Sequence, residues 1–150
     1  MKRKVGIVAV LLVAIALGAF REFVFINLNY SIDHLANHRP YSYAHSSFTA
    51  LVHGLDLGQL VVLKWLLAAL FIGVMLALTV LMSNLLFGDH RYRLVLAVGT
   101  AVLGTLALLL HFAGHWHPAF DLVSVKLLHL LQYPAILLFL GAASMLRRSP

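Results

Sequence analysis

The sequence predicts an all-α polytopic membrane protein: a four-transmembrane-helix bundle with a polar outer segment that contains a short interfacial helix. Of its 150 residues, 62% are hydrophobic, well above the half or less expected of a soluble domain, and the mean hydropathy is +0.95. A helix of about 20 apolar residues crosses a bilayer. Because backbone groups in lipid must bond to one another, four apolar runs are expected to form helices in a single domain, 1–150, at positions 5–26, 60–82, 94–112 and 122–146.

Basic residues gather on one side of this four-span arrangement: Lys2, Arg3, Lys4, Arg91, Arg93, Arg147 and Arg148. The positive-inside rule makes that side cytoplasmic. We therefore expect a multi-pass protein of the inner (cytoplasmic) membrane, with both termini in the cytoplasm and segment 27–59 outside. This placement accounts for the net charge of +6, so no nucleic-acid partner is expected.

The first apolar run also fits a secretory signal peptide, since it has a basic start and small residues around Ala16–Ala19. Apolar residues resume after Arg21 and Glu22, however, from Phe23 to Ile26. This pattern favours a span that is retained over one that is cleaved.

The outer segment, 27–59, carries its own helix signals. Ser46 or Ser47 can cap a short helix from Phe48 to His53, which Gly54 ends, and its apolar residues predict that it lies flat on the outer surface. Asp56 followed by Gln59 three residues later is a capping box, and it predicts the start of the second span.

Small residues at four-residue spacing predict the inner seams of the bundle, where two helices approach closely. They occur in the second span and the third: Ala69, Gly73 and Ala77; Ala97, Ala101 and Thr105; Thr100 and Gly104. The short connections 83–93 and 111–121 predict antiparallel packing of spans two and three, and of spans three and four. Pro134 is expected to kink the fourth span near Leu130.

Four charged residues fall in the outer parts of the spans: Arg21, Glu22, Lys64 and Lys126. Ionisable residues at such depths cost about 2.5–3.5 kcal/mol each, so they pair, face inward or extend to the interface. Three cations against one carboxylate leave a positive surplus. An anionic lipid headgroup or a partner's carboxylate could neutralise it, and the alternative is that the two lysines only reach out to water.

Histidines provide a second candidate site, for haem or a divalent metal. His111 and His115 are four residues apart, the spacing with which one helix presents two imidazoles to a metal, and His111 with His129 could ligate a haem from two helices. The His111–His115 pair lacks the glutamate of the HExxH motif. Haem or metal binding is therefore the alternative to lipid or partner binding.

Nothing in the sequence indicates catalytic residues. Serines such as Ser124 lack the strand–turn–helix context of a nucleophile, and the absence of cysteine excludes disulfides, thiolate metal sites and a cysteine nucleophile. The sequence thus favours an interaction protein over an enzyme.

The chain resembles the small four-span membrane proteins that accompany exosortases in some Bacteroidota. The similarity covers nearly the whole chain and rests on Arg21 followed by aromatic residues, on Lys64–Trp65, on a short basic turn and on the run from Lys126 to Gln132–Tyr133–Pro134. It implies an accessory role beside a membrane-embedded transpeptidase that sorts proteins to the cell surface. With the resemblance, the candidate lipid- or partner-binding set becomes Arg21, Glu22, Lys64, Trp65, Lys126 and Gln132.

Overall fold

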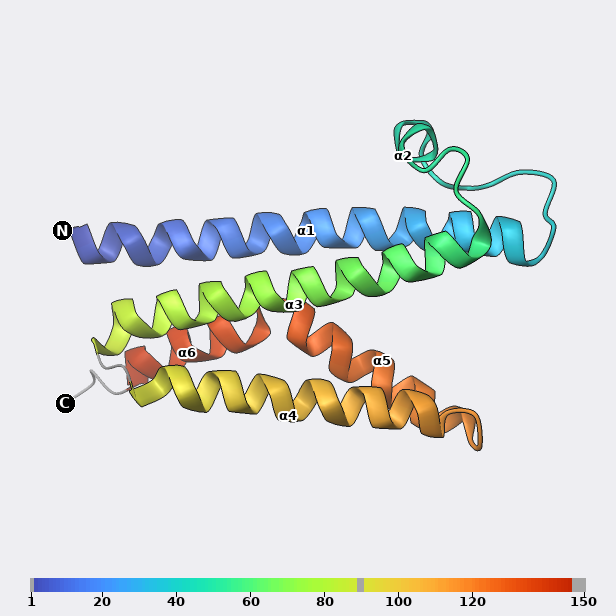
Figure 1. Cartoon of the computed structure of the whole chain (residues 1–150). Coiled ribbons are helices and arrows are strands. Elements are labelled where there is room, and N and C mark those ends of the chain that lie inside the picture. The colour runs from blue at the N-terminus through green and yellow to red at the C-terminus, as the bar shows by residue number, and fades with distance from the viewer. Residues whose placement is uncertain (1, 89–90, 147–150) are drawn as a thin grey trace.

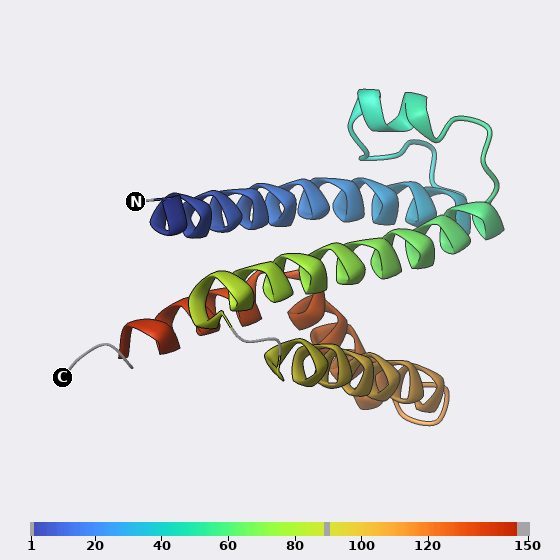
Figure 2. The ribbon, with the colours of Figure 1, turned by 60° about the vertical axis from the view of Figure 1, so that its left-hand side comes forward.

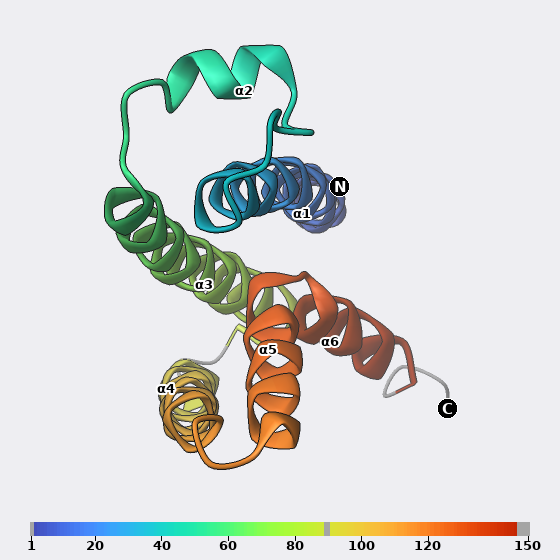
Figure 3. The same cartoon turned by 90° about the vertical axis from the view of Figure 1, so that its right-hand side faces the viewer.

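A computed structural model describes residues 2–88 and 91–146. Helices and turns make up these residues, which confirms the predicted all-α class (Figure 1). In chain order the helices are α1 (Lys2–Ala36), α2 (Ser46–Leu51), α3 (Leu57–Phe87), α4 (Arg91–Ala113), α5 (Pro118–Gln132) and α6 (Ala135–Leu146). Viewed end-on, α3 lies between α1 on one side and the α4–α5 pair on the other (Figure 3).

Three helices are each long and apolar enough to cross a membrane: Arg3–Ala36, Leu57–Phe87 and Tyr92–Ala113. The predicted fourth span is broken into α5 and α6, which meet at an angle of 58° and make a fourth crossing only if the bent pair is counted as one span. The break falls at Tyr133–Pro134, slightly after the kink predicted near Leu130, because proline has no N–H to continue the helical ladder.

Helix α1 continues ten residues past Ile26, the predicted end of the first span. Its 35 residues measure about 52 Å, against about 30 Å for a hydrocarbon core. Polar residues are tolerated in this extension because they bond to the helix itself. The Asn27 side-chain amide donates to the Phe23 carbonyl at 2.7 Å, and the Ser31 hydroxyl donates to the Asn27 carbonyl at 3.0 Å.

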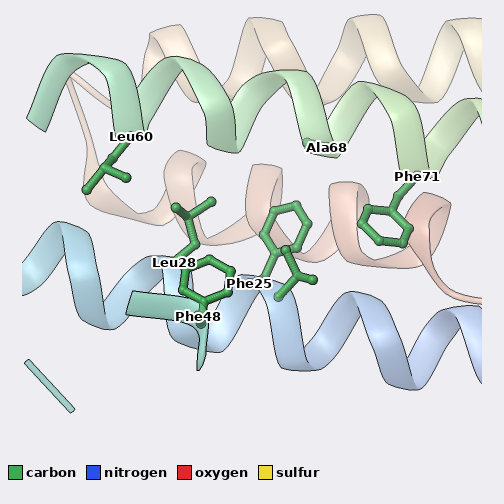
Figure 4. Close-up of a cluster of buried hydrophobic side chains, with 7 residues drawn as sticks. Phe25, Leu28, Phe48, Leu60, Ala68 and Phe71 are labelled. Atoms are coloured by element: carbon green, nitrogen blue, oxygen red, sulfur yellow. The ribbon is translucent and has the colours of Figure 1, made fainter. Parts of the chain in front are cut away.

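The connection from α1 to α3 folds back onto α1 (Figure 1). The His45 amide donates to the Asn27 side-chain oxygen at 2.6 Å. Phe48 of α2 is buried in one cluster with Leu28 of α1 (Figure 4). His45, not a serine, caps α2, and Gly54 takes a left-handed conformation three residues after α2 ends. The predicted capping box is present at the start of α3. The Asp56 carboxylate accepts from the Gln59 backbone amide at 2.8 Å, and the Gln59 side-chain oxygen accepts from the Asp56 backbone amide at 3.0 Å.

Two apolar clusters join α1 to α3, one near each end. The cluster near the C-terminal end of α1 includes Phe25, Leu28 and Phe71 (Figure 4), and the cluster near its N-terminal end includes Val10, Ala14 and Met82. The predicted seam Ala69–Gly73–Ala77 is wrong, because these residues are exposed and α3 instead buries the face of Ala68, Phe71, Met75 and Thr79. A helix that is apolar all round gives no sign of which face meets its neighbours.

The predicted seam Ala97–Ala101–Thr105 on α4 is also exposed and therefore wrong, whereas Thr100 and Gly104 are half-buried. Close packing of α4 on α5 occurs at Ala107, which is fully buried and whose carbonyl accepts from the Ser124 hydroxyl at 2.7 Å. The predicted antiparallel neighbours are in contact, since α3 touches α4 and α4 packs along α5 (Figure 2).

Predicted cytoplasmic cations gather at the C-terminal end of α3. Arg3 donates to the carbonyls of Leu85 and Leu86, and Arg93 donates to the Asn84 side-chain oxygen at 3.0 Å. These cations complement the partial negative charge of a helix C-terminus. The start of α1 and the end of α6 lie at this same end of the bundle (Figure 1). Arg147 and Arg148 lie outside the described residues.

Candidate functional site: a polar pocket between α1, α3, α4 and α5

Arg21 is a buried charge in the middle of the bundle. It is only 2% exposed, and two of its guanidinium nitrogens donate to the side-chain oxygen of Gln132, at 2.9 and 2.7 Å. Gln132 is the last residue of α5 and is 1% exposed. A buried charge is tolerated only when it is paired and hydrogen-bonded, and Gln132 supplies part of that requirement.

The rest of the Arg21 guanidinium is satisfied by Glu22 and Tyr133. Its third nitrogen donates to the Glu22 carboxylate at 3.0 Å and to the Tyr133 hydroxyl at 3.1 Å, and this hydroxyl in turn donates to Glu22. The guanidinium also lies over the rings of Phe25 and Tyr133, at 4.5 and 4.9 Å from their centroids. Arg21 therefore holds the point where α5 breaks into α6 against α1.

A cavity of about 270 Å³ opens beside this network, between α1, α3, α4 and α5. Its lining combines ionisable and polar side chains with apolar ones: Arg21, Glu22, Phe25, Ile26, Asn29, Lys64, Trp65, Ala68, His111, Asp121, Ser124, Val125, Leu128, His129 and Gln132. Such a mixture suits an amphiphile, because polar groups can orient its head while apolar side chains contact its tail.

Lys64 is the one lysine that lines this cavity. It is half-buried, and no described residue lies within hydrogen-bonding or ion-pairing distance of its ammonium group. The carboxylate of Asp121 attracts it at longer range, and Arg21 repels it. The other charged groups of the lining have close partners, since Arg21 is paired with Glu22, and Asp121 with His111. Lys64 is therefore the group best able to take an external anion.

The predicted charge cluster is thus assembled only in part. The structure brings Arg21, Glu22 and Lys64 together with Trp65 and Gln132, but Lys126 is exposed and does not line the cavity. Sequence reasoning missed Asp121, the second carboxylate of the lining besides Glu22. A signal for it existed: Asp121, Ser124, Val125, Leu128, His129 and Gln132 recur at helical spacing and share one face of α5, whereas Lys126 is on another.

His111 and Asp121 form a close pair near the turn that joins α4 to α5. Nδ1 of His111 lies 2.8 Å from a carboxylate oxygen of Asp121, and the imidazole meets the Trp65 ring edge-on with centroids 5.1 Å apart. The tight turn after α4 permits this pairing. A Cβ placed on Gly114 would lie 2.9 Å from both the Asp121 Cβ and the His111 carbonyl oxygen.

Two of the three predicted metal or haem ligands share the cavity. His111 and His129 both line it, whereas His115 is exposed and its ring nitrogen approaches the Phe112 carbonyl at 3.2 Å. The described ranges hold no group of three or more His, Cys, Asp or Glu residues arranged to bind a metal. The Ser124 hydroxyl is directed to the Ala107 carbonyl, which leaves its proton engaged within the fold.

Comparison of the chain with protein-family models, with curated proteins and with solved structures finds no match.

Proposed function

We propose that this chain is an integral membrane protein of four crossings whose basic end, marked by Arg3 and Arg93, faces the cytoplasm. The 23 residues of α4 measure about 34 Å, close to the thickness of a hydrocarbon core. His111 lies near the outer end of α4, and its contact with Trp65 puts Lys64 at the same level. The pocket would then open at the outer boundary of the hydrocarbon, with the ends of α1 and α3 projecting beyond it.

Cysteine labelling tests this orientation directly, because the chain has no cysteine of its own. Tyr41 and Tyr92 are exposed and lie at opposite ends of the bundle. In intact cells a membrane-impermeant maleimide is expected to label the Tyr41→Cys variant and to label Tyr92→Cys only after permeabilisation. Equal labelling of both variants in intact cells would overturn the orientation.

We further propose that the pocket binds the anionic headgroup of a membrane lipid. The observation that carries this proposal is the half-buried Lys64 ammonium, which has no close partner among the described residues. An ammonium group removed from water and left unpaired is costly, and a phosphate oxygen from a ligand would remove that cost. The apolar lining residues, such as Phe25 and Leu128, support a lipid over a soluble anion because they offer contacts to its acyl chains.

Lys64→Met is expected to weaken this binding at least about tenfold, since a hydrogen bond to a charged group contributes about 1.5–3 kcal/mol. The measurement uses purified protein in phosphatidylcholine nanodiscs and spin-labelled phosphatidylmethanol, a singly charged phosphodiester lipid. Lys126→Met is the matched control, because Lys126 is exposed and does not line the cavity. Equal affinities of the two variants would mean that Lys64 only extends to water.

The pocket also keeps the haem alternative open, because His111 and His129 line it from different helices. A Soret band in the purified protein that disappears in the His129→Ala variant would support haem binding in place of lipid binding.

An accessory role in an exosortase-type sorting system rests on the resemblance alone and stays a prediction. A pocket that binds a lipid headgroup is compatible with such a role beside a membrane-embedded transpeptidase, and the chain itself lacks the cysteine that the transpeptidase would need. Co-purification with an exosortase encoded nearby would support the prediction. Failure of the two proteins to co-purify would contradict it.

A further inference from the structure

We infer that the headgroup bound at Lys64 carries hydroxyl groups, as a phosphoglycerol headgroup does, and that His111 accepts a hydrogen bond from one of them. This inference rests on the proposed function and names its ligand class. The observation behind it is separate from Lys64: the close pair of His111 and Asp121 in the wall of the same cavity.

The Asp121 carboxylate determines which nitrogen of His111 carries the proton. An ionised carboxylate only accepts hydrogen bonds, so Nδ1 of His111, at 2.8 Å from it, is the donor. In a neutral imidazole the other nitrogen, Nε2, is then an acceptor. Aspartate orients a histidine in this way in hydrolytic triads, where the exposed nitrogen takes a proton from a hydroxyl group.

Nε2 of His111 has no hydrogen-bond partner among the described residues. Trp65 packs against the ring edge-on and helps to hold its orientation. Two carboxylates, Glu22 and Asp121, also line the cavity, but each already has a close partner. In its neutral form, the His111 imidazole therefore presents Nε2 as an acceptor in the cavity that also holds Lys64, whose ammonium has no close partner among the described residues.

A ligand that satisfies both groups needs an anionic oxygen for Lys64 and an O–H donor for His111. A phosphodiester that bears glycerol meets both needs within one small headgroup. A phosphodiester that ends in a methyl group meets only the first. The apolar part of the lining favours a lipid with this headgroup over free glycerol phosphate.

The test compares phosphatidylglycerol with phosphatidylmethanol, which carries the same charge and no hydroxyl, in phosphatidylcholine nanodiscs. The wild-type protein is expected to bind phosphatidylglycerol about fivefold more tightly, the value of one net hydrogen bond. Soluble glycerol 1-phosphate is expected not to compete. Effective competition would instead assign the site to the free phosphate ester and overturn the lipid part of the inference.

Asp121→Asn is expected to abolish this preference, so that the variant binds phosphatidylglycerol and phosphatidylmethanol with about equal affinity. An asparagine amide can donate to Nδ1, which moves the imidazole proton to Nε2 and removes the acceptor. His111→Phe keeps a ring against Trp65 and lacks the nitrogen, so it should give the same result and decides the matter if Asp121→Asn fails to fold. His115→Gln, a change at an exposed histidine outside the cavity, is the control and should keep the wild-type preference.

The outcomes separate this inference from the proposed function. Equal binding of the two lipids by the wild type, with binding still lost in Lys64→Met, overturns the role of His111 and leaves the anion site standing. Binding that does not depend on Lys64 overturns both. A preference that survives in both Asp121→Asn and His111→Phe also overturns the inference.

Discussion

Arg21→Ala is expected to lower the free energy of unfolding by about 3 kcal/mol, at the lower end of the range for breaking a buried ion pair. The lower end applies because Glu22, its ionic partner, is half-exposed. The substitution leaves the buried Gln132 side-chain oxygen without its donor and removes the cation from between the rings of Phe25 and Tyr133. Reversible unfolding in mixed detergent micelles, followed by helicity, measures the loss.

Arg39→Ala is the matched control. Its guanidinium lies 2.9 Å from the Asp33 carboxylate, but the two side chains are 48% and 37% exposed. Exposed ion pairs contribute about 0–1 kcal/mol, so this variant should unfold almost as the wild type does. Arg21→Lys should be intermediate, because an ammonium group cannot match the forked geometry of guanidinium. Equal stabilities of Arg21→Ala and Arg39→Ala would contradict the role of Arg21 at the α5–α6 break.

Gly114→Ala is expected to destabilise the protein by about 1–3 kcal/mol, the usual cost of forcing extra volume into a packed site. The added Cβ would lie 2.9 Å from the Asp121 Cβ and from the His111 carbonyl oxygen, and neither group can rotate away as the end of a flexible side chain can. The α4–α5 hairpin must open to accommodate it, which separates His111 from Asp121. Thermal unfolding in detergent measures the stability.

Gly99→Ala provides the comparison for Gly114→Ala. Gly99 lies within α4, and a Cβ there meets no atom within 4 Å. Alanine also favours a helix over glycine by about 0.8–1 kcal/mol, so Gly99→Ala should leave stability unchanged or slightly raised. A similar loss in both variants would show that the close approach at Gly114 does not account for the effect.

Local features of the chain were predictable where the physical cause lies within a few residues. The Asp56–Gln59 capping box depends on groups three residues apart, and the break at Pro134 depends on one missing N–H. Arg3 and Arg93 both lie at the C-terminal end of α3. They meet there because long apolar helices joined by short connections alternate in direction, so that the start of α1, the end of α3 and the start of α4 share one end of the bundle. These interactions involve no choice among competing partners.

The stripes of small residues show where sequence reasoning failed. Ala69, Gly73 and Ala77 have the spacing of a helix contact, yet α3 turns the neighbouring face of Phe71 and Met75 toward its partners. In an apolar helix every face can be buried, so spacing identifies a stripe without saying whether another helix covers it. Which face is used depends on the volumes that α1, α4, α5 and α6 present to α3.

Some residues of the candidate site were likewise predictable from the sequence, and others were not. Sequence alone identified Arg21, Glu22 and Lys64 as charges that a span must satisfy, since an ionisable residue in lipid requires an explanation wherever it occurs. Only the tertiary structure excluded Lys126, added Asp121 and His111 to the same wall, and paired Arg21 with a residue 111 positions away. Depth along a span follows from counting residues, but rotation about the helix axis follows from packing, and that rotation selects which charges meet.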